Sequence, residues 1–201
     1  MSVSVVDYGL GNLGSVANML KRVGVPNNRV TSSEEILTAE RILLPGVGAF
    51  DRGTALLRDA KLIDALRQFA ASGRPLLGIC LGMQLLLDSS EEGVSEGLGL
   101  IPGRSRRFEE APGLRVPHMG WNGVIPRRDD PLFASLPDDN RFYFVHSYRV
   151  VPEREDDVLA GTTYGAPFAS MIRRDNVMGA QFHPEKSHTF GMVVLRNFAQ
   201  I

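Results

Sequence analysis

The sequence contains one cysteine in 201 residues, so it cannot form an internal disulfide bond. A chain with so little cysteine suits a reducing compartment, and we expect it in the cytoplasm. No apolar run reaches the ~18 residues that a membrane-spanning helix needs. Residues Met1–Asp7 carry neither a basic start nor an apolar core, so we expect no signal peptide. The sequence therefore indicates neither a disulfide-bonded secreted protein nor a membrane protein.

An excess of one charge is also missing, because 22 basic residues face 23 acidic ones and the net charge is −1. General binding to nucleic acid or to an anionic membrane requires a basic excess, so we expect neither partner. Internal repeats and low-complexity linkers are absent as well. Hydrophobic residues make up 43% of the chain, which is typical of a globular protein, and we expect one domain over residues 1–201.

What the sequence does contain is an alternation of short apolar strands with helical segments. In the first half we expect strands at Val3–Val6, Arg29–Thr31, Arg41–Leu44 and Leu76–Ile79, and helices at Ser15–Val23 and within Asp51–Ala71. This order predicts an open, mostly parallel sheet flanked by helices on both faces, with catalytic loops at the carboxyl ends of the strands. The second half predicts additional antiparallel strands at Arg141–Val151, Val158–Thr163 and Phe168–Ile172, and a closing helix at Thr189–Phe198.

The lone cysteine, Cys80, lies in the segment Gly78–Gly82, between an apolar strand and the helix-like run Met83–Leu87. This arrangement predicts a sharp turn with a thiol at its apex, where the flanking glycines relieve crowding of the backbone. Free N–H groups at the start of the helix would stabilise the thiolate, which is the form that attacks carbonyl carbons. The same pattern occurs in unrelated hydrolases, and a buried structural cysteine is the alternative.

Farther along the chain, His183 and Glu185 stand on either side of a proline, directly after an expected strand at Val177–Phe182. A cysteine nucleophile needs a base to take its proton, and the base needs a group to orient it. Histidine and glutamate supply both functions, so the sequence predicts a triad of Cys80, His183 and Glu185. A surface turn in which both side chains only meet solvent is the alternative.

A third pattern is the Pro-Gly-Val-Gly sequence that follows the expected strand at Arg41–Leu44. Glycines let backbone N–H groups turn toward a ligand, which is what a developing oxyanion requires. The backbone donors predicted to form this oxyanion hole belong to Gly46, Val47, Gly48 and Leu81. An ordinary loop in which Asp51 caps the following helix is the alternative.

In this chain order, the three patterns resemble the class I (triad) glutamine amidotransferases. The segments Asp7–Asn12, Pro117–Asn122 and Tyr143–Tyr148 are similar to a narrower family, the glutaminase subunits of imidazole glycerol phosphate synthase in histidine biosynthesis. The resemblance covers Met1–Ile201 and implies a flavodoxin-like α/β fold that hydrolyses glutamine to glutamate and ammonia. We expect no metal and no organic cofactor, because the histidines show no metal-ligand spacing with the cysteine.

The resemblance also implies contacts to the substrate and to a partner. The residues implied to contact glutamine are Gln84, Glu92, Ser147 and Tyr148. The residues implied to lie near the partner are Asn12, His118, Met119, Trp121 and Asn122. That partner is a TIM-barrel cyclase subunit, which uses the ammonia to convert a phosphoribulosyl-formimino ribonucleotide (PRFAR) to imidazole glycerol phosphate and an aminoimidazole carboxamide ribotide (AICAR). For the polar residues a solvated or packing role is the alternative, and for Trp121 a role as core anchor.

Three other hypotheses stay open at this point. One is a different triad glutaminase, such as the subunit of pyridoxal phosphate synthase. Another is a redox sensor or chaperone that also carries a cysteine on an elbow, although this leaves His183 and Glu185 unexplained. The third is a non-catalytic subunit that only activates the cyclase. The basic cluster Arg104–Arg107 could contact an acidic partner, but we expect a solvated face.

Overall fold

The computed structural model describes residues 1–110 and 113–201. Its α-helices are α1 (Leu13–Arg22), α2 (Ser33–Thr38), α3 (Phe50–Asp59), α4 (Ile63–Ala71), α5 (Leu81–Leu85) and α6 (His188–Phe198). Short 3-10 turns are η1 (Pro131–Phe133), η2 (Glu155–Asp157) and η3 (Pro184–Lys186). None of the helices in these described ranges is long and apolar enough to cross a bilayer.

The strands form one large sheet and one small sheet. The first strands of the chain are β1 (Val3–Val6), β2 (Asn27–Val30), β3 (Ile42–Gly46), β4 (Leu76–Cys80), β5 (Ser89–Ser90) and β6 (Gly103–Arg107). The later strands are β7 (His118–Asn122), β8 (Ile125–Pro126), β9 (Phe142–His146), β10 (Tyr148–Pro152), β11 (Val158–Tyr164), β12 (Ala166–Arg174) and β13 (Val177–Ala180). Strands β7 and β9 pair only with each other, while the rest belong to the large sheet.

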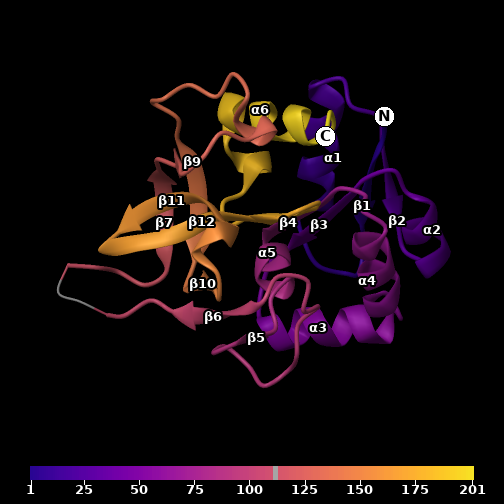
Figure 1. The fold of residues 1–201 in the computed structure, drawn as a ribbon, viewed down its shortest axis with the longest axis horizontal. Helices are drawn as coiled ribbons and strands as arrows, with labels where there is room; N and C mark the ends of the chain where they lie inside the picture. The colour runs from indigo at the N-terminus through magenta and orange to yellow at the C-terminus, as the bar shows by residue number, and fades with distance from the viewer. Residues whose placement is uncertain (111–112) are drawn as a thin grey trace.

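The parallel part of the large sheet has the order β2-β1-β3-β4-β13. Its inner strands are apolar and buried throughout, which is expected when helices cover both faces. Helices α1 and α6 lie on one face, and α3, α4 and α5 lie on the other (Figure 1). Leu20 and Phe198 pack into the core of the first face, and Leu57 and Phe69 into that of the second. The predicted α/β fold is confirmed.

Antiparallel strands extend the sheet beyond β13, in the order β12-β10-β6, with β11 paired to β12. The single strand expected at Arg141–Val151 is wrong. Strand β9 ends at His146 and β10 begins at Tyr148, and β9 pairs with β7 while β10 pairs with β12 and β6. The chain therefore changes sheets at Ser147, a switch that depends on tertiary packing and that no glycine or proline marks in the sequence.

The carboxyl ends of β3 and β4 bring two of the predicted loops together. In the register of this parallel pair, Gly46 lies opposite Cys80. Strand β4 also pairs with β13, which ends at Ala180, shortly before His183. Parallel strands end at the same edge of a sheet, so the segments that follow β3, β4 and β13 meet there.

Candidate active site

Cys80 occupies a strained turn between β4 and α5. Its backbone has φ of 54° and ψ of −110°, in the left-handed half of conformational space that a residue with a Cβ rarely adopts. The turn is tight enough that a Cβ on Gly82 would overlap the carbonyl oxygen of Leu44. The thiol is 7% exposed, and Cys80 lines a cavity of about 570 Å³. A sequence of strand, turn and helix thus presents the sulfur to a cavity, as a nucleophile requires.

His183 and Glu185 lie in the same region as an ion pair. Nδ1 of His183 is 2.8 Å from Oε1 of Glu185, and each side chain is 2% exposed. The hydroxyl of Ser187 donates to the carbonyl oxygen of His183, over 2.6 Å, and so fixes the backbone that carries the imidazole. His183 lines the cavity together with Cys80. Its Nε2 has no hydrogen-bond partner in the described part of the chain, so it is free to exchange a proton in the cavity.

The electrostatics of this group favour a charged imidazole. Burial lowers the pKa of His183, but its interactions with Cys80 and Glu185 outweigh burial and raise the pKa to about 10. An imidazolium beside a thiol stabilises the thiolate. The pair is therefore arranged for nucleophilic attack by sulfur followed by proton transfer from nitrogen.

The predicted oxyanion residues do not all reach the cavity. Val47, Gly48 and Leu81 line it, whereas Gly46 is buried inside β3. Gly48 has φ of 99°, a conformation that suits glycine. The alternative role for Asp51 is wrong, because its carboxylate accepts hydrogen bonds from backbone N–H groups of the 94–95 loop. The structure has Glu92 at the start of α3 instead, where its carboxylate accepts from the N–H of Phe50 over 2.8 Å.

The four predicted glutamine contacts all line the cavity. Gln84 is 5% exposed, and its Nε2 donates to the carbonyl oxygen of Tyr148 and to Oε1 of Gln181, each over 3.2 Å. Glu92 follows β5 on a loop, not at the helix end considered as its alternative. Ser147 and Tyr148 reach the cavity because the chain switches sheets between β9 and β10.

Several side chains at the site escape prediction from the sequence. Gln181 donates from Nε2 to the sulfur of Cys80 over 3.9 Å, and its place two residues before His183 could have indicated a shared face. Lys186 and His146 also line the cavity. The hydroxyl of Tyr8 donates to the carbonyl oxygen of Pro45 over 2.9 Å and so holds the strand that leads into the oxyanion loop. These last three contacts join segments far apart in the chain, and no local pattern indicates them.

The residues implied to lie near a partner divide between two faces of β7. Met119 and Trp121 are 62% and 45% exposed, which excludes a role for Trp121 as core anchor. The side chain of His118 is 3% exposed, so the expectation that it contributes to a partner surface is wrong. Alternation along a strand turns His118 inward when Met119 and Trp121 face outward. Asn122 is partly buried on β7, and Asn12 stands just before α1.

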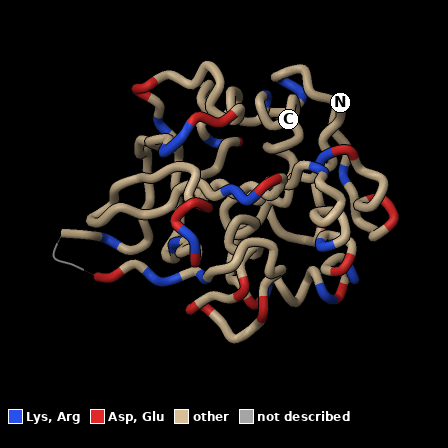
Figure 2. The backbone as a smooth tube through the Cα atoms, in the orientation of Figure 1, with Lys and Arg blue, Asp and Glu red and all other residues tan. Residues whose placement is uncertain are grey.

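The basic cluster on β6 is paired within the chain. Arg106 lies 3.8 Å from Glu91, and Arg107 lies 3.0 Å from Glu110. Lys and Arg alternate with Asp and Glu along the backbone (Figure 2). A solvated, charge-balanced face is therefore the better description of this cluster.

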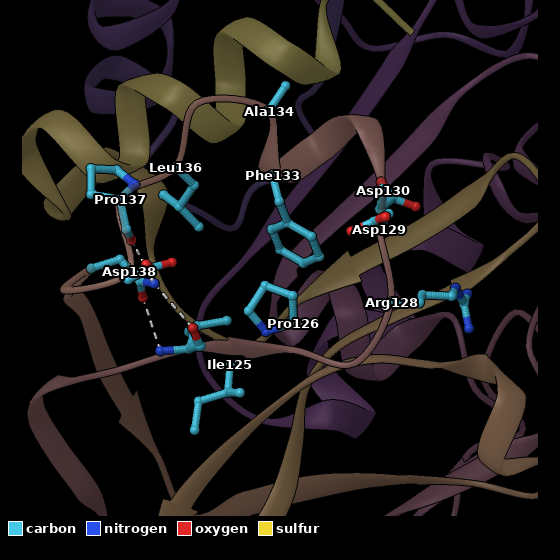
Figure 3. Close-up of a pocket in the computed structure, with 12 residues that line it drawn as sticks. Ile125, Pro126, Arg128, Asp129, Asp130, Phe133, Ala134, Leu136, Pro137 and Asp138 are labelled. Atoms are coloured by element: carbon cyan, nitrogen blue, oxygen red, sulfur yellow. Dashed lines mark hydrogen bonds between the residues drawn. The ribbon is translucent and has the colours of Figure 1, made fainter.

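A second cavity, of about 460 Å³, lies between β8 and the loop around η1 (Figure 3). Phe133 and Pro126 point into it, and Arg128, Asp129 and Asp130 lie at its edge. Among its lining residues in the described chain there is no cysteine or histidine. It offers no nucleophile or base, so the candidate chemistry belongs to the cavity of Cys80. No group of three or more His, Cys, Asp or Glu within residues 1–110 and 113–201 is arranged to hold a metal ion.

Comparison with known sequences gives matches over the length of the chain. Residues 4–201 match the family described as Glutamine amidotransferase class-I. The chain is 49% identical over 200 residues to imidazole glycerol phosphate synthase subunit HisH 2 of Pseudomonas aeruginosa, with 99% of both chains covered. It is 46% identical over 203 residues to the HisH subunit of Bdellovibrio bacteriovorus, covering 99% of this chain and 100% of that one.

Solved structures with the same fold are more distant in sequence. The structure of PurLQS from Thermotoga maritima has a TM-score of 0.76 at 21% identity, covering 99% of this chain and 97% of that one. A crystal structure of a glutamine amidotransferase has a TM-score of 0.72 at 22% identity and covers 100% of both chains. At these identities the likeness shows a shared fold.

Proposed function

The chain belongs to the class-I glutamine amidotransferases and, among them, to the HisH subunits of imidazole glycerol phosphate synthase, and from this premise we propose that Cys80, His183 and Glu185 hydrolyse glutamine. The observation that carries the proposal is the arrangement of the cavity. A cysteine on a strained turn shares it with a buried histidine, and a carboxylate 2.8 Å away holds that histidine. We further propose that residues 1–201 form a single glutaminase domain, which the match over residues 4–201 supports.

The reaction begins with attack of the Cys80 thiolate on the side-chain amide carbon of glutamine. The oxyanion that forms accepts hydrogen bonds from backbone N–H groups of the 46–48 loop and of Leu81. His183 donates its proton to the leaving nitrogen, and ammonia departs from a glutamyl thioester. Water, deprotonated by His183, then cleaves the thioester to glutamate and restores the thiol. Glu185 holds one tautomer of the imidazole and stabilises its charged form.

Glutamine carries an ammonium and a carboxylate, and the cavity offers polar groups on the side away from the thiol. Gln84, Glu92, Ser147 and Tyr148 are the proposed contacts. The free oxygen of the Glu92 carboxylate suits the ammonium, since its other oxygen already binds the N–H of Phe50. Lys186, which also lines the cavity, suits the carboxylate by charge.

The second part of the proposal is that ammonia passes to a TIM-barrel cyclase subunit, which converts PRFAR to imidazole glycerol phosphate and AICAR. The printed names of the relatives describe subunits of a synthase, which supports a partner. Met119 and Trp121 offer large apolar side chains for such a contact, because they are exposed on β7 next to the cavity-lining residue Pro117.

The experiment that tests both parts measures release of glutamate from glutamine by the purified chain. It compares the chain alone, the chain with the cyclase subunit, and that complex with PRFAR, each against Cys80→Ala. We expect low activity alone, a large gain in the complex, and loss of both in the variant. Equal activity with and without the cyclase would remove the partner. Activity that survives in Cys80→Ala would overturn the triad, and reaction of Cys80 with peroxide but not glutamine would favour a redox sensor.

A further inference from the structure

Two buried histidines outside the proposed triad are hydrogen-bonded to each other. Nδ1 of His118, on β7, lies 3.1 Å from Nε2 of His146, at the end of β9. The two side chains belong to residues that are 3% and 6% exposed. The aromatic rings that enclose them include Phe108, Phe144, Tyr164 and Phe168. The chemistry proposed above gives neither imidazole a role.

Backbone groups at one end of this pair fix the orientation of an amide. Oδ1 of Asn122 accepts from the N–H of Gly123 over 2.9 Å, and its Nδ2 donates to the carbonyl oxygen of Thr163 over 2.9 Å. The amide therefore cannot be flipped. Its Nδ2 also lies 3.3 Å from Nε2 of His118, so this ring nitrogen must accept.

A backbone group at the other end leads to the same assignment. Nδ1 of His146 lies 2.8 Å from the carbonyl oxygen of Tyr148, which can only accept. Nδ1 of His146 therefore carries a proton, and in a neutral ring Nε2 accepts. The N–H of His118 Nδ1 fills that acceptor, so both ends require the Nδ1–H tautomer in both rings. Burial favours the uncharged rings, because it lowers the pKa of His118 to about 4 and that of His146 to about 3.

The carbonyl of Tyr148 is where this chain of hydrogen bonds meets the cavity. It also accepts from Nε2 of Gln84 over 3.2 Å. The same Nε2 donates to Oε1 of Gln181, whose own Nε2 donates to the sulfur of Cys80. Both hydrogens of the Gln84 amide are thus engaged, which leaves its oxygen as the polar group that faces the cavity.

We propose that Asn122, His118 and His146 form a positioning relay of neutral groups that fixes the Tyr148 carbonyl and, through it, the acceptor orientation of Gln84. The relay acts at Ser147, where the chain changes sheets and the backbone carbonyl of Tyr148 lies at the crossover. A fixed amide oxygen in the cavity selects a ligand that donates a hydrogen bond there. That this ligand is glutamine rests on the proposed function, whereas the relay itself does not.

The direct test is the tautomeric state of the two imidazoles. In the full chain labelled with nitrogen-15, the ring-nitrogen chemical shifts at neutral pH identify which nitrogen is protonated, and His118→Asn assigns the signals of His118. We expect Nδ1–H in both His118 and His146, with Nε2 unprotonated. An Nε2–H tautomer or a charged imidazole at either position would overturn the relay. This result does not depend on glutaminase activity, so it stands apart from the proposed function.

A matched pair of variants tests the effect on the substrate. Leucine and asparagine are nearly equal in size, but only asparagine can donate to Nε2 of His146. We expect His118→Leu to raise the KM for glutamine about tenfold with a smaller change in kcat, and His118→Asn to recover most of the loss. Equal KM values in the two variants would contradict the relay.

A packing control separates the hydrogen bonds from the aromatic cluster. Phe168 contacts both imidazoles, at ring distances of 5.7 and 5.4 Å, and makes no hydrogen bond to them. We expect Phe168→Leu to lower the Tm without raising the KM. A rise in KM as large as that of His118→Leu would assign the effect to packing and overturn the relay. Failure of the wild-type chain to release glutamate, with the expected tautomers intact, would count against the proposed function only.

Discussion

At the scale of single residues, the proposed chemistry depends on a protonated His183. Glu185→Gln keeps the shape of the carboxylate and one acceptor oxygen but removes its charge. Because that charge helps to raise the pKa of His183 to about 10, the pKa in the variant falls by about one to three pH units. Titration of His183 by NMR measures this directly. An unchanged pKa would show that Glu185 does not stabilise the imidazolium.

The same pKa shift makes a prediction about stability. The folded-state pKa of His183 lies above its ordinary value of about 6.5, so folding favours the protonated ring. The resulting stabilisation is fully present below about pH 6.5 and is lost as the pH rises toward 10. The free energy of unfolding of wild type minus that of Glu185→Gln is therefore largest near about pH 6 and shrinks as the pH increases. Urea unfolding over this range measures it, and a difference independent of pH would contradict the linkage.

The sequence predicts residues that lie in local patterns and misses those that meet only in the fold. Cys80 with its flanking glycines, and His183 with Glu185, are recognisable because each pattern occupies a few consecutive residues. Gln181 and His146 reach the site through contacts with residues far away in the chain. The inward orientation of His118 follows from the register of β7 on β9, which the sequence does not reveal.

At the scale of elements, the turn between β4 and α5 requires glycine at position 82. We expect Gly82→Ala to lower the free energy of unfolding by about 3 kcal/mol, because the new Cβ would overlap the carbonyl oxygen of Leu44. Gly14→Ala is the matched control. Nothing lies within 4 Å of a Cβ at Gly14 in α1, so it raises stability by about 0.5–1 kcal/mol through helix propensity. Urea unfolding compares both, and equal effects would contradict the steric argument.

Element type is easier to predict than sheet membership. The apolar run that becomes β4 and the helical spacing that becomes α1 identify themselves from composition and period. The split of the expected strand at Arg141–Val151 does not, because both halves are extended and only their partners differ. That split matters for function, since it brings Ser147 and Tyr148 into the cavity.

At the scale of the molecule, the parallel strands carry the nucleophile, and the small sheet of β7 and β9 carries both the relay and the exposed aromatic surface. The outward side chains of β7 therefore lie on the same strand as His118 and Asn122, whose hydrogen bonds lead to Gln84. A partner that contacts Met119 and Trp121 binds directly over this route. The molecule needs no additional element to place a partner beside the cavity.

The last prediction concerns that surface. Trp121 is 45% exposed and stacks on His188, with ring centres 5.2 Å apart, so it is held in place before a partner binds. A preordered aromatic residue contributes strongly to binding, and we expect Trp121→Ala to cost about 2 kcal/mol or more, roughly thirtyfold in Kd for the cyclase subunit. Leu37→Ala is the control, because Leu37 is 37% exposed on α2, at the opposite end of the sheet (Figure 1). Calorimetry of each variant with the cyclase measures the difference. Equal affinities would move the partner surface away from β7, whereas a loss confined to Trp121→Ala would place the cyclase over the strand that carries the relay.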